Sequence, residues 1–239
     1  LRILGERTLS GYFRDREALV QTILEAEEQQ LGGVYWTPQR LCPDLHKRNP
    51  EQLKRPGRGD LTSDREVERY RYLLVDFDPE RKTNTSSSDR ELGEAVQVAV
   101  GAVRDLTTEG WPAPTAWACS GNGVHLFFPI DLPTSKAELL NRTLKAIGKR
   151  FDTAIIKSDS TVSNPSRIFR AYGTTNRKGD ATAERPHRQA CLLPMEWLEI
   201  SDCAGQLLTE AKMEAFASEN AQSRKGPKPR RVRASQADD

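Results

Sequence analysis

The stretch YRYLLVDFD at residues 70–78 is the strongest local indication of the fold. Its aromatic and aliphatic side chains predict a buried strand that ends before Pro79. Asp76 and Asp78 lie two positions apart, and because a strand alternates its side chains between two faces, both carboxylates point to one side, about 6.6 Å apart along the strand. The pair alone is a weak signal for a site, since Asp-Pro also begins many turns.

The segments that follow predict a helix and then a hairpin. Ser88 with Glu91 has the form of a capping box, and residues 92–106 repeat apolar side chains at helical spacing. Residues 115–119 and 124–130 predict two strands, and the tight turn between them contains Asn-Gly, a strong hairpin signal.

A second helix and a last strand complete the unit. Ser135 with Glu138 predicts another capping box before an apolar helical repeat, and residues 154–157 predict a fourth strand. The order β-α-β-β-α-β is the split βαβ arrangement, in which right-handed crossovers place the first and third strands side by side. We therefore expect the pair of carboxylates to lie close to His125, near the start of the third strand.

The predicted fold class is α+β. Residues 70–180 would form an RRM-like sheet of the split βαβ, ferredoxin-like kind, with an additional N-terminal α/β unit at residues 1–65. In that unit, residues 16–30 predict a helix and residues 33–37 a strand.

Charge is unevenly distributed over the 239 residues. Lys and Arg total 36 and Asp and Glu total 34, a net charge of +2 that argues against a polycation coating nucleic acid by charge alone. Six basic and two acidic side chains fall in residues 224–239, which leaves the remainder with a net charge of −2. We expect a C-terminal helix within residues 201–220. At residues 221–239 we expect a disordered basic tail, either a linker to an absent domain or a nucleic-acid-binding arm.

The cysteines and the apolar runs indicate the redox environment of the protein and whether it spans a membrane. The 4 cysteines lie far apart without a C-x-x-C pair, and the 3 His show no zinc-finger spacing. We therefore expect a reduced, cytoplasmic protein without structural zinc. We expect neither a membrane span nor a signal peptide, and the start at Leu1 suggests a piece of a longer chain.

Several polar motifs predict a site at one edge of this sheet. Two carboxylates on one face can hold divalent cations, and two such ions suit in-line displacement at phosphorus. The turn Ser120-Gly121-Asn122-Gly123, with His125 beyond it, can approach an anion closely, although an ordinary hairpin explains it equally well. Asp159 follows the predicted fourth strand, which lies beside the first, and can add a third carboxylate.

Basic residues gather after the fourth strand. They lie beside glycine-bearing turns, which suits a triphosphate or a template backbone, and a solvated polar stretch fits as well. These residues are Arg167, Arg170, Arg177 and Lys178, close to Gly173 and Gly179.

Together these motifs resemble one family. D-F-D on a strand, S-G-N-G-V-H on a hairpin and the later Asp159 resemble the three motifs of the archaeo-eukaryotic primase superfamily. The stretch NPSRIFRAYGTTNRKG resembles its bacterial, phage and plasmid primase-polymerase branch, and the early GVYWT strand also fits. The resemblance extends over most of the chain.

The resemblance implies a catalytic domain at residues 1–200 that acts as a template-directed nucleotidyltransferase, a DNA primase or a primer-extending DNA polymerase or both. It implies two divalent ions, Mg²⁺ or Mn²⁺, held by catalytic Asp76, Asp78 and Asp159. It also implies that the incoming NTP or dNTP is bound by the hairpin turn, and we extend this contact to two later basic residues. The nucleotide-binding set is then Ser120, Gly121, Gly123, His125, Arg167 and Lys178.

The implied partners are single-stranded DNA template, primer and nucleoside triphosphates, with a helicase or another replication or defence domain on the same or another chain. We expect Lys54, Arg55 and Arg58 to contact the template, because that loop is basic and contains glycine. The chain lacks the cysteine pattern of the zinc-binding module that many family members carry.

Two other classes stay open. A non-catalytic RRM-like module would bind single-stranded nucleic acid by stacking on exposed aromatic side chains, here Phe77, Phe127 and Phe128, which core packing explains equally well. A D-x-D glycosyltransferase would need a Rossmann-like half, which the predicted strand order does not provide. The Asp and His side chains distinguish a nucleotidyltransferase from a stacking module, since a stacking module needs no metal site.

Overall fold

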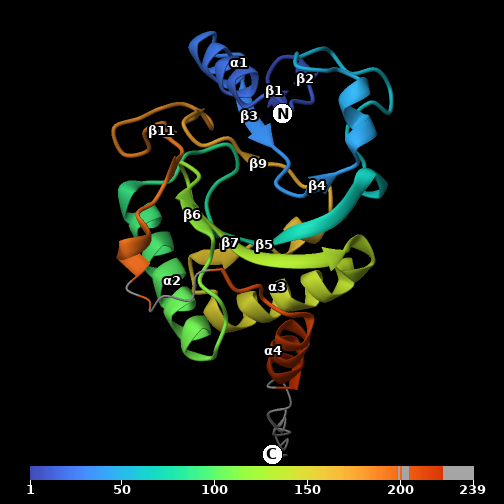
Figure 1. Cartoon of the computed structure of the whole chain (residues 1–239). Helices are drawn as coiled ribbons and strands as arrows, with labels where there is room; N and C mark the ends of the chain where they lie inside the picture. The colour runs from blue at the N-terminus through green and yellow to red at the C-terminus, as the bar shows by residue number, and fades with distance from the viewer. Residues whose placement is uncertain (199, 201–204, 223–239) are drawn as a thin grey trace, which may run out of the picture.

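The computed structural model describes residues 1–198, 200 and 205–222. Within them the chain has a mixed α/β fold with a curled antiparallel main sheet and four α-helices (Figure 1). Apart from residues 221 and 222, the predicted basic tail lies outside the described residues. No helix in the described part of the chain is long and apolar enough to cross a membrane.

The main sheet is built around the long strand β5 (Val67–Pro79). β7 (Val124–Pro133) pairs along one edge of β5, and β8 (Ile156–Ser158) pairs with the last residues of β5 along the other edge. β6 (Ala116–Cys119) pairs with the outer edge of β7. Two short strands extend the sheet, β4 (Arg40–Leu41) beside β5 and β12 (Cys191–Leu192) beside β6. The predicted adjacency of the first and third strands is thus confirmed.

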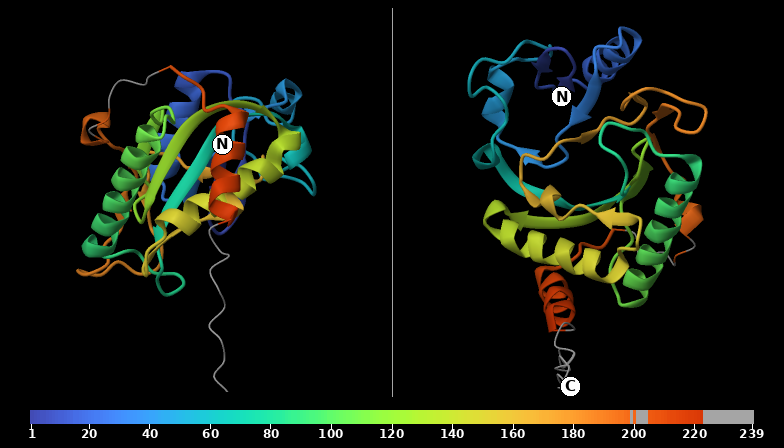
Figure 2. Two further views of the ribbon diagram at one scale, coloured as in Figure 1. Left: turned by 90° about the horizontal axis from the view of Figure 1, so that it is seen from below. Right: turned by 180° about the vertical axis from the view of Figure 1, so that it is seen from behind.

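Helices cover one face of this sheet, and the N-terminal unit lies on the other (Figure 2). α2 (Asp89–Thr108) begins with the predicted capping box, in which Ser88 and Glu91 each accept the other's backbone N–H. Leu106 and the alanines of its inner face are buried. The apolar spacing of α2 therefore sets which side packs on the sheet.

The second predicted capping box is wrong. A 3₁₀ turn, η3 (Thr134–Lys136), contains Ser135 and precedes α3 (Ala137–Phe151), whose N-cap residue makes no side-chain capping bond. The 3₁₀ turn changes the position of the serine relative to the first helical turn, so it cannot reach the N–H groups of α3. α4 (Glu210–Gln222) packs on α3, in the region where the sequence predicts the C-terminal helix.

The N-terminal sheet has the order β2-β1-β3-β9. Its last strand comes from far along the chain, because β9 (Phe169–Arg170) pairs with β3 (Gly33–Trp36). The sheet is completed by β1 (Arg2–Leu4), β2 (Thr8–Ser10) and the covering helix α1 (Arg16–Glu28).

The remaining elements are short. β10 and β11 form a separate hairpin, and five 3₁₀ turns, including η3, lie in connecting segments of the described chain. These elements are β10 (Thr175–Asn176), β11 (Arg188–Gln189), η1 (Pro43–Lys47), η2 (Asp64–Glu66), η4 (Ser160–Ser163) and η5 (Met195–Leu198).

The turn between β6 and β7 is where the sequence predicts it. Cys119 pairs with Val124, so four residues form the loop, and the residue with positive φ is Gly121, at 91°. The Asn-Gly pair therefore marks the hairpin correctly, while the conformation that favours glycine lies one residue before the asparagine.

Candidate functional site

A cavity of about 500 Å³ opens between the main sheet and the N-terminal sheet. The N-terminal unit contributes Tyr35 from β3 and the glycines just before it. The opposite wall comes from the ends of β5 and β7, the β6–β7 turn and the segments after β8. The predicted site residues among the lining are Asp76, Asp78, Ser120, His125, Asp159, Arg167 and Lys178.

Strand pairing brings the three carboxylates to this cavity. Asp76 and Asp78 stand on β5, and Asp159, directly after β8, donates its backbone N–H to the Asp76 carbonyl at 2.9 Å. The Asp78 carboxylate accepts from Arg81 Nη2 at 3.1 Å, and the Asp159 carboxylate accepts from the Thr161 N–H at 2.7 Å. Asp76 Oδ1 is buried and has no hydrogen-bond partner.

The environment of Asp76 disfavours its charge. Burial is the main cause, with Asp78 and Asp159 as further causes, and together they raise the pKa of the Asp76 carboxyl well above its ordinary value. Arg167 and Arg81 partly oppose this rise in pKa. An unpartnered carboxylate oxygen next to two further carboxylates fits an oxygen-coordinated divalent cation, which would relieve the repulsion.

His125 lies beside this carboxylate as a neutral ring. Burial, with a smaller contribution from Arg170, lowers the pKa of His125 to about 3. Its Nδ1 lies 2.8 Å from the Tyr172 hydroxyl, and its ring packs edge-on against Phe169. When Tyr172 donates to Nδ1, the other ring nitrogen carries the proton and is a donor on the cavity side.

The β6–β7 turn is folded tightly against Asp78. Ser120 Oγ accepts the Gly123 N–H at 2.9 Å, which closes the loop. A Cβ atom on Gly123 would lie 2.4 Å from Asp78 Oδ1, and one on Gly121 would lie 2.7 Å from Asn176 Cβ. Both predicted glycines therefore act by permitting close approach rather than by lining the cavity.

Buried polar atoms without partners concentrate at this cavity. Six such side-chain atoms occur in the described residues, and four belong to residues that line the cavity. One is an acceptor and three are donors: Asp76 Oδ1, Asn122 Nδ2, Arg167 Nε and Arg170 Nη1. Because buried polar groups are nearly always hydrogen-bonded in native proteins, this set marks the cavity as a candidate site for a polar ligand.

The predicted metal trio shares the cavity without forming a closed ligand cluster. Across the described residues, no group of three or more His, Cys, Asp or Glu side chains is arranged to hold a metal ion. Asp78 and Asp159 instead bond to Arg81 and Thr161. Ligation by all three carboxylates therefore stays a prediction.

Other predicted contacts lie elsewhere, and some lining residues were not predicted. Lys54, Arg55 and Arg58 do not line the cavity. Tyr35 and Arg81 line it but were not predicted. The signal for Arg81 was its position three residues after Asp78, whereas Tyr35 reaches the cavity only because β9 joins the N-terminal sheet.

No protein-family model matches the sequence, and no curated protein matches it. Among solved structures, the chain is similar to the AEP domain of the cyanophage S-2L primase-polymerase, with 15% identity and a TM-score of 0.36 over 85% of this chain and 98% of that one. It is also similar to primase RepB′, with 15% identity and a TM-score of 0.40 over 87% of this chain and 50% of that one. At this identity and TM-score, the similarity carries no conclusion about function.

Proposed function

We propose that the chain is a template-directed nucleotidyltransferase of the archaeo-eukaryotic primase kind, with residues 1–200 as the catalytic domain and the RRM-like, split βαβ sheet as its centre. The observation that carries the proposal is the set of unpartnered buried atoms. One carboxylate oxygen and three donors belong to residues that line a single cavity. A nucleoside triphosphate bound with divalent cations supplies what each of these atoms lacks.

The residues that would hold the divalent cations differ from those that would hold the triphosphate. Asp76, Asp78 and Asp159 would hold Mg²⁺ or Mn²⁺, since carboxylate oxygens are the ligands these ions prefer. When bound, such ions supply a lowered pKa for an attacking hydroxyl and stabilisation of a departing pyrophosphate.

Basic and neutral donors would hold the triphosphate. Arg167 Nε and Arg170 Nη1 are buried donors without partners, and Lys178 adds a cation at the rim. The neutral His125 donates without adding charge beside Asp76. These groups orient the α-phosphorus toward a primer 3′-hydroxyl and stabilise charge on the phosphate oxygens during transfer.

The reaction joins the 3′-hydroxyl oxygen to the α-phosphorus and breaks the bond to the pyrophosphate. No covalent enzyme intermediate is needed. Single-stranded DNA template, primer and nucleoside triphosphates are the substrates we propose, and a helicase or other fused module stays a prediction.

The test is nucleotide incorporation on a single-stranded DNA template, with and without primer, using ribo- and deoxyribonucleotides in turn and Mg²⁺ or Mn²⁺. We expect metal-dependent extension with at least one nucleotide type. Absence of incorporation with every combination, from protein that is folded by circular dichroism, would overturn the proposal.

The alternative of a stacking module has less support. Phe77, Phe127 and Phe128, the aromatic side chains it would need, are 0%, 4% and 0% exposed. They pack in the core and offer no surface for bases, so this alternative loses the feature on which it depended.

A further inference from the structure

The β10–β11 hairpin forms one rim of the cavity. Its first strand and the two residues after it contribute Asn176, Arg177 and Lys178 to the lining. The Lys178 ammonium makes no hydrogen bond or ion pair with any described residue, whereas its backbone carbonyl is held. The position of this free cation therefore depends on how the hairpin backbone is anchored.

One anchor is on α1. Both terminal guanidinium nitrogens of Arg177, Nη1 and Nη2, donate to the Glu27 carboxylate, at 3.1 and 2.6 Å, and the Thr175 N–H donates to the same carboxylate at 3.1 Å. This anchor ties the start of the hairpin to the N-terminal unit.

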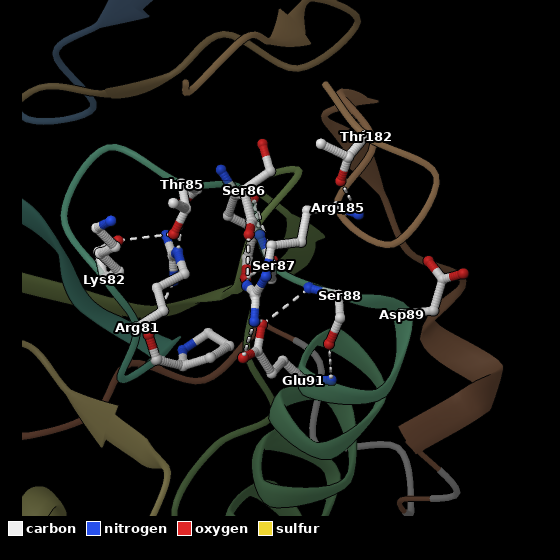
Figure 3. A network of polar contacts seen from close by, with 12 residues as sticks. Arg81, Lys82, Thr85, Ser86, Ser87, Ser88, Asp89, Glu91, Thr182 and Arg185 are labelled. Carbon is white, nitrogen blue, oxygen red and sulfur yellow. Dashed lines mark hydrogen bonds and ion pairs between the residues drawn. The ribbon is translucent and has the colours of Figure 1, made fainter. Parts of the chain in front are cut away.

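The second anchor is at the first turn of α2. Arg185 reaches from the hairpin loop and donates to both oxygens of Glu91, at 2.7 and 2.8 Å (Figure 3). It also donates to the Ser86 carbonyl at 2.7 Å. Side-chain exposures of 28% for Arg185 and 20% for Glu91 make this bidentate pair half-buried.

Ser86 connects this anchor to Lys178. Its side chain is buried, and its Oγ donates to the Lys178 carbonyl at 3.0 Å. Gly179 follows with a φ of 67°, and a Cβ atom there would lie 2.0 Å from the Asn84 carbonyl oxygen. The loop backbone is thus pressed against residues 84–86, and the contacts run from Glu91 through Arg185 and Ser86 to Lys178.

We infer that Arg185 is a positioning residue that holds Lys178 at the rim of the cavity, where it meets the anionic part of the ligand. The inference rests on the proposed function. It means that the Arg185–Glu91 ion pair increases the affinity for nucleotide. Arg188 separately bonds Asp89 and the Ser87 carbonyl. Loss of Arg185 therefore loosens the loop without detaching the hairpin.

The experiment compares three variants of the full chain. Arg185→Ala removes the anchor. Glu91→Gln removes the charge, while its amide oxygen can still accept the Ser88 N–H in the capping box. Arg90→Ala is the matched control for the loss of an arginine. Arg90 precedes Glu91 in the sequence, and its ion pair is with Glu94 rather than with the hairpin loop. The readouts are KM and kcat for nucleotide incorporation and the rate of tryptic cleavage after Arg177 and Lys178.

For Arg185→Ala and Glu91→Gln we expect the nucleotide KM to rise about tenfold, because one contact to phosphate is lost. The kcat should change less than about twofold. Tryptic cleavage at the two sites should accelerate, and Arg185→Lys should restore part of the affinity. Unchanged KM and cleavage, or equal changes in Arg90→Ala, would overturn the inference. If wild type incorporates no nucleotide, the proposed function fails. The proteolysis comparison still decides whether Arg185 anchors the loop, and an unchanged rate refutes that too.

Discussion

Asp76 and His125 lie directly opposite each other in the antiparallel pair β5–β7, with His125 Nε2 3.6 Å from Asp76 Oδ1. This distance is too long for a hydrogen bond, and the lowered pKa of His125 means that the ring carries no charge at neutral pH. The two groups therefore do not satisfy each other. Each is left available to a ligand in the cavity.

The first prediction concerns the carboxylates on β5. Asp76→Asn with Asp78→Asn should lower metal-dependent incorporation by at least about a hundredfold, because oxygen ligands and charge at the reacting phosphate are lost. The fold should persist, since a neutral side chain at position 76 avoids the cost of burying a charge, which is the main cause of the raised pKa of Asp76, and also the repulsion from Asp78 and Asp159. Incorporation assays and circular dichroism measure the two effects. A double variant that extends primers as well as wild type would refute the role of both residues.

Metal binding can be measured without turnover. Adding Mn²⁺ should raise the melting temperature of wild type, because a ligand that binds only the folded state stabilises it. The double Asn variant should not respond. An equal shift in both proteins would locate the ion elsewhere.

The second prediction concerns His125. His125→Ala should raise the nucleotide KM about tenfold through the loss of one donor to the triphosphate. Tyr172→Phe, which removes only the partner of Nδ1, should have a smaller effect. If KM stays the same in His125→Ala, the histidine has a packing role against Phe169 and no more.

The third prediction concerns the β6–β7 turn. Gly123→Ala places a methyl group against Asp78 Oδ1 and the Phe77 carbonyl, so incorporation should fall and the free energy of unfolding should drop by about 1–3 kcal/mol. Gly101→Ala on α2, where a Cβ meets nothing within 4 Å, is the control and should raise stability by about 0.5–1 kcal/mol. Equal behaviour of the two variants in urea denaturation would contradict the crowding at Gly123.

The fourth prediction concerns pH and the start of β5. The Ser63 backbone N–H, with Arg48 as a further cause, lowers the pKa of Glu66 to about 2. Because the folded pKa is depressed, the stabilisation is present above the unfolded value of 4.5 and is lost as pH falls from there toward 2. Glu66→Gln should therefore reduce the free energy of unfolding at pH 7 by roughly 1 kcal/mol. Its effect should shrink near pH 3, and a constant difference across that range would argue against the shift.

The fifth prediction concerns the basic loop outside the cavity. Substituting Lys54, Arg55 and Arg58 together by Ala should weaken filter binding of single-stranded template and make its salt dependence shallower, by up to about one unit of slope per lost contact. The control replaces Arg142, Lys145 and Lys149 by Ala. These residues are on α3, on the opposite face of the main sheet from the N-terminal unit, so the same loss of charge there should change template affinity little. Unchanged template affinity in the first variant would exclude the loop from the template path.

Local patterns predicted much of the scaffold. The period-two placement of Asp76 and Asp78, the Ser88–Glu91 capping box and the Asn-Gly turn each depend on neighbouring residues, and such short-range rules carried through to the structure. The predicted Ser135–Glu138 capping box does not form, because a 3₁₀ turn that contains Ser135 precedes α3. The adjacency of the first and third of these strands also followed from the sequence, and the pairing of β5 with β7 confirms it.

Local sequence patterns predicted that Asp76, Asp78, Asp159 and His125 lie at one place, because pairing of adjacent strands brings their positions side by side. What surrounds these side chains follows from the packing of segments that are far apart in the sequence. Tyr35 reaches the cavity because β9 crosses to the N-terminal sheet, and Lys178 because Arg185 bonds a carboxylate 94 residues away. Likewise, only packing shows that Phe77, Phe127 and Phe128 are core residues rather than stacking surfaces. Such contacts depend on burial and on long-range approach, which no local periodicity encodes.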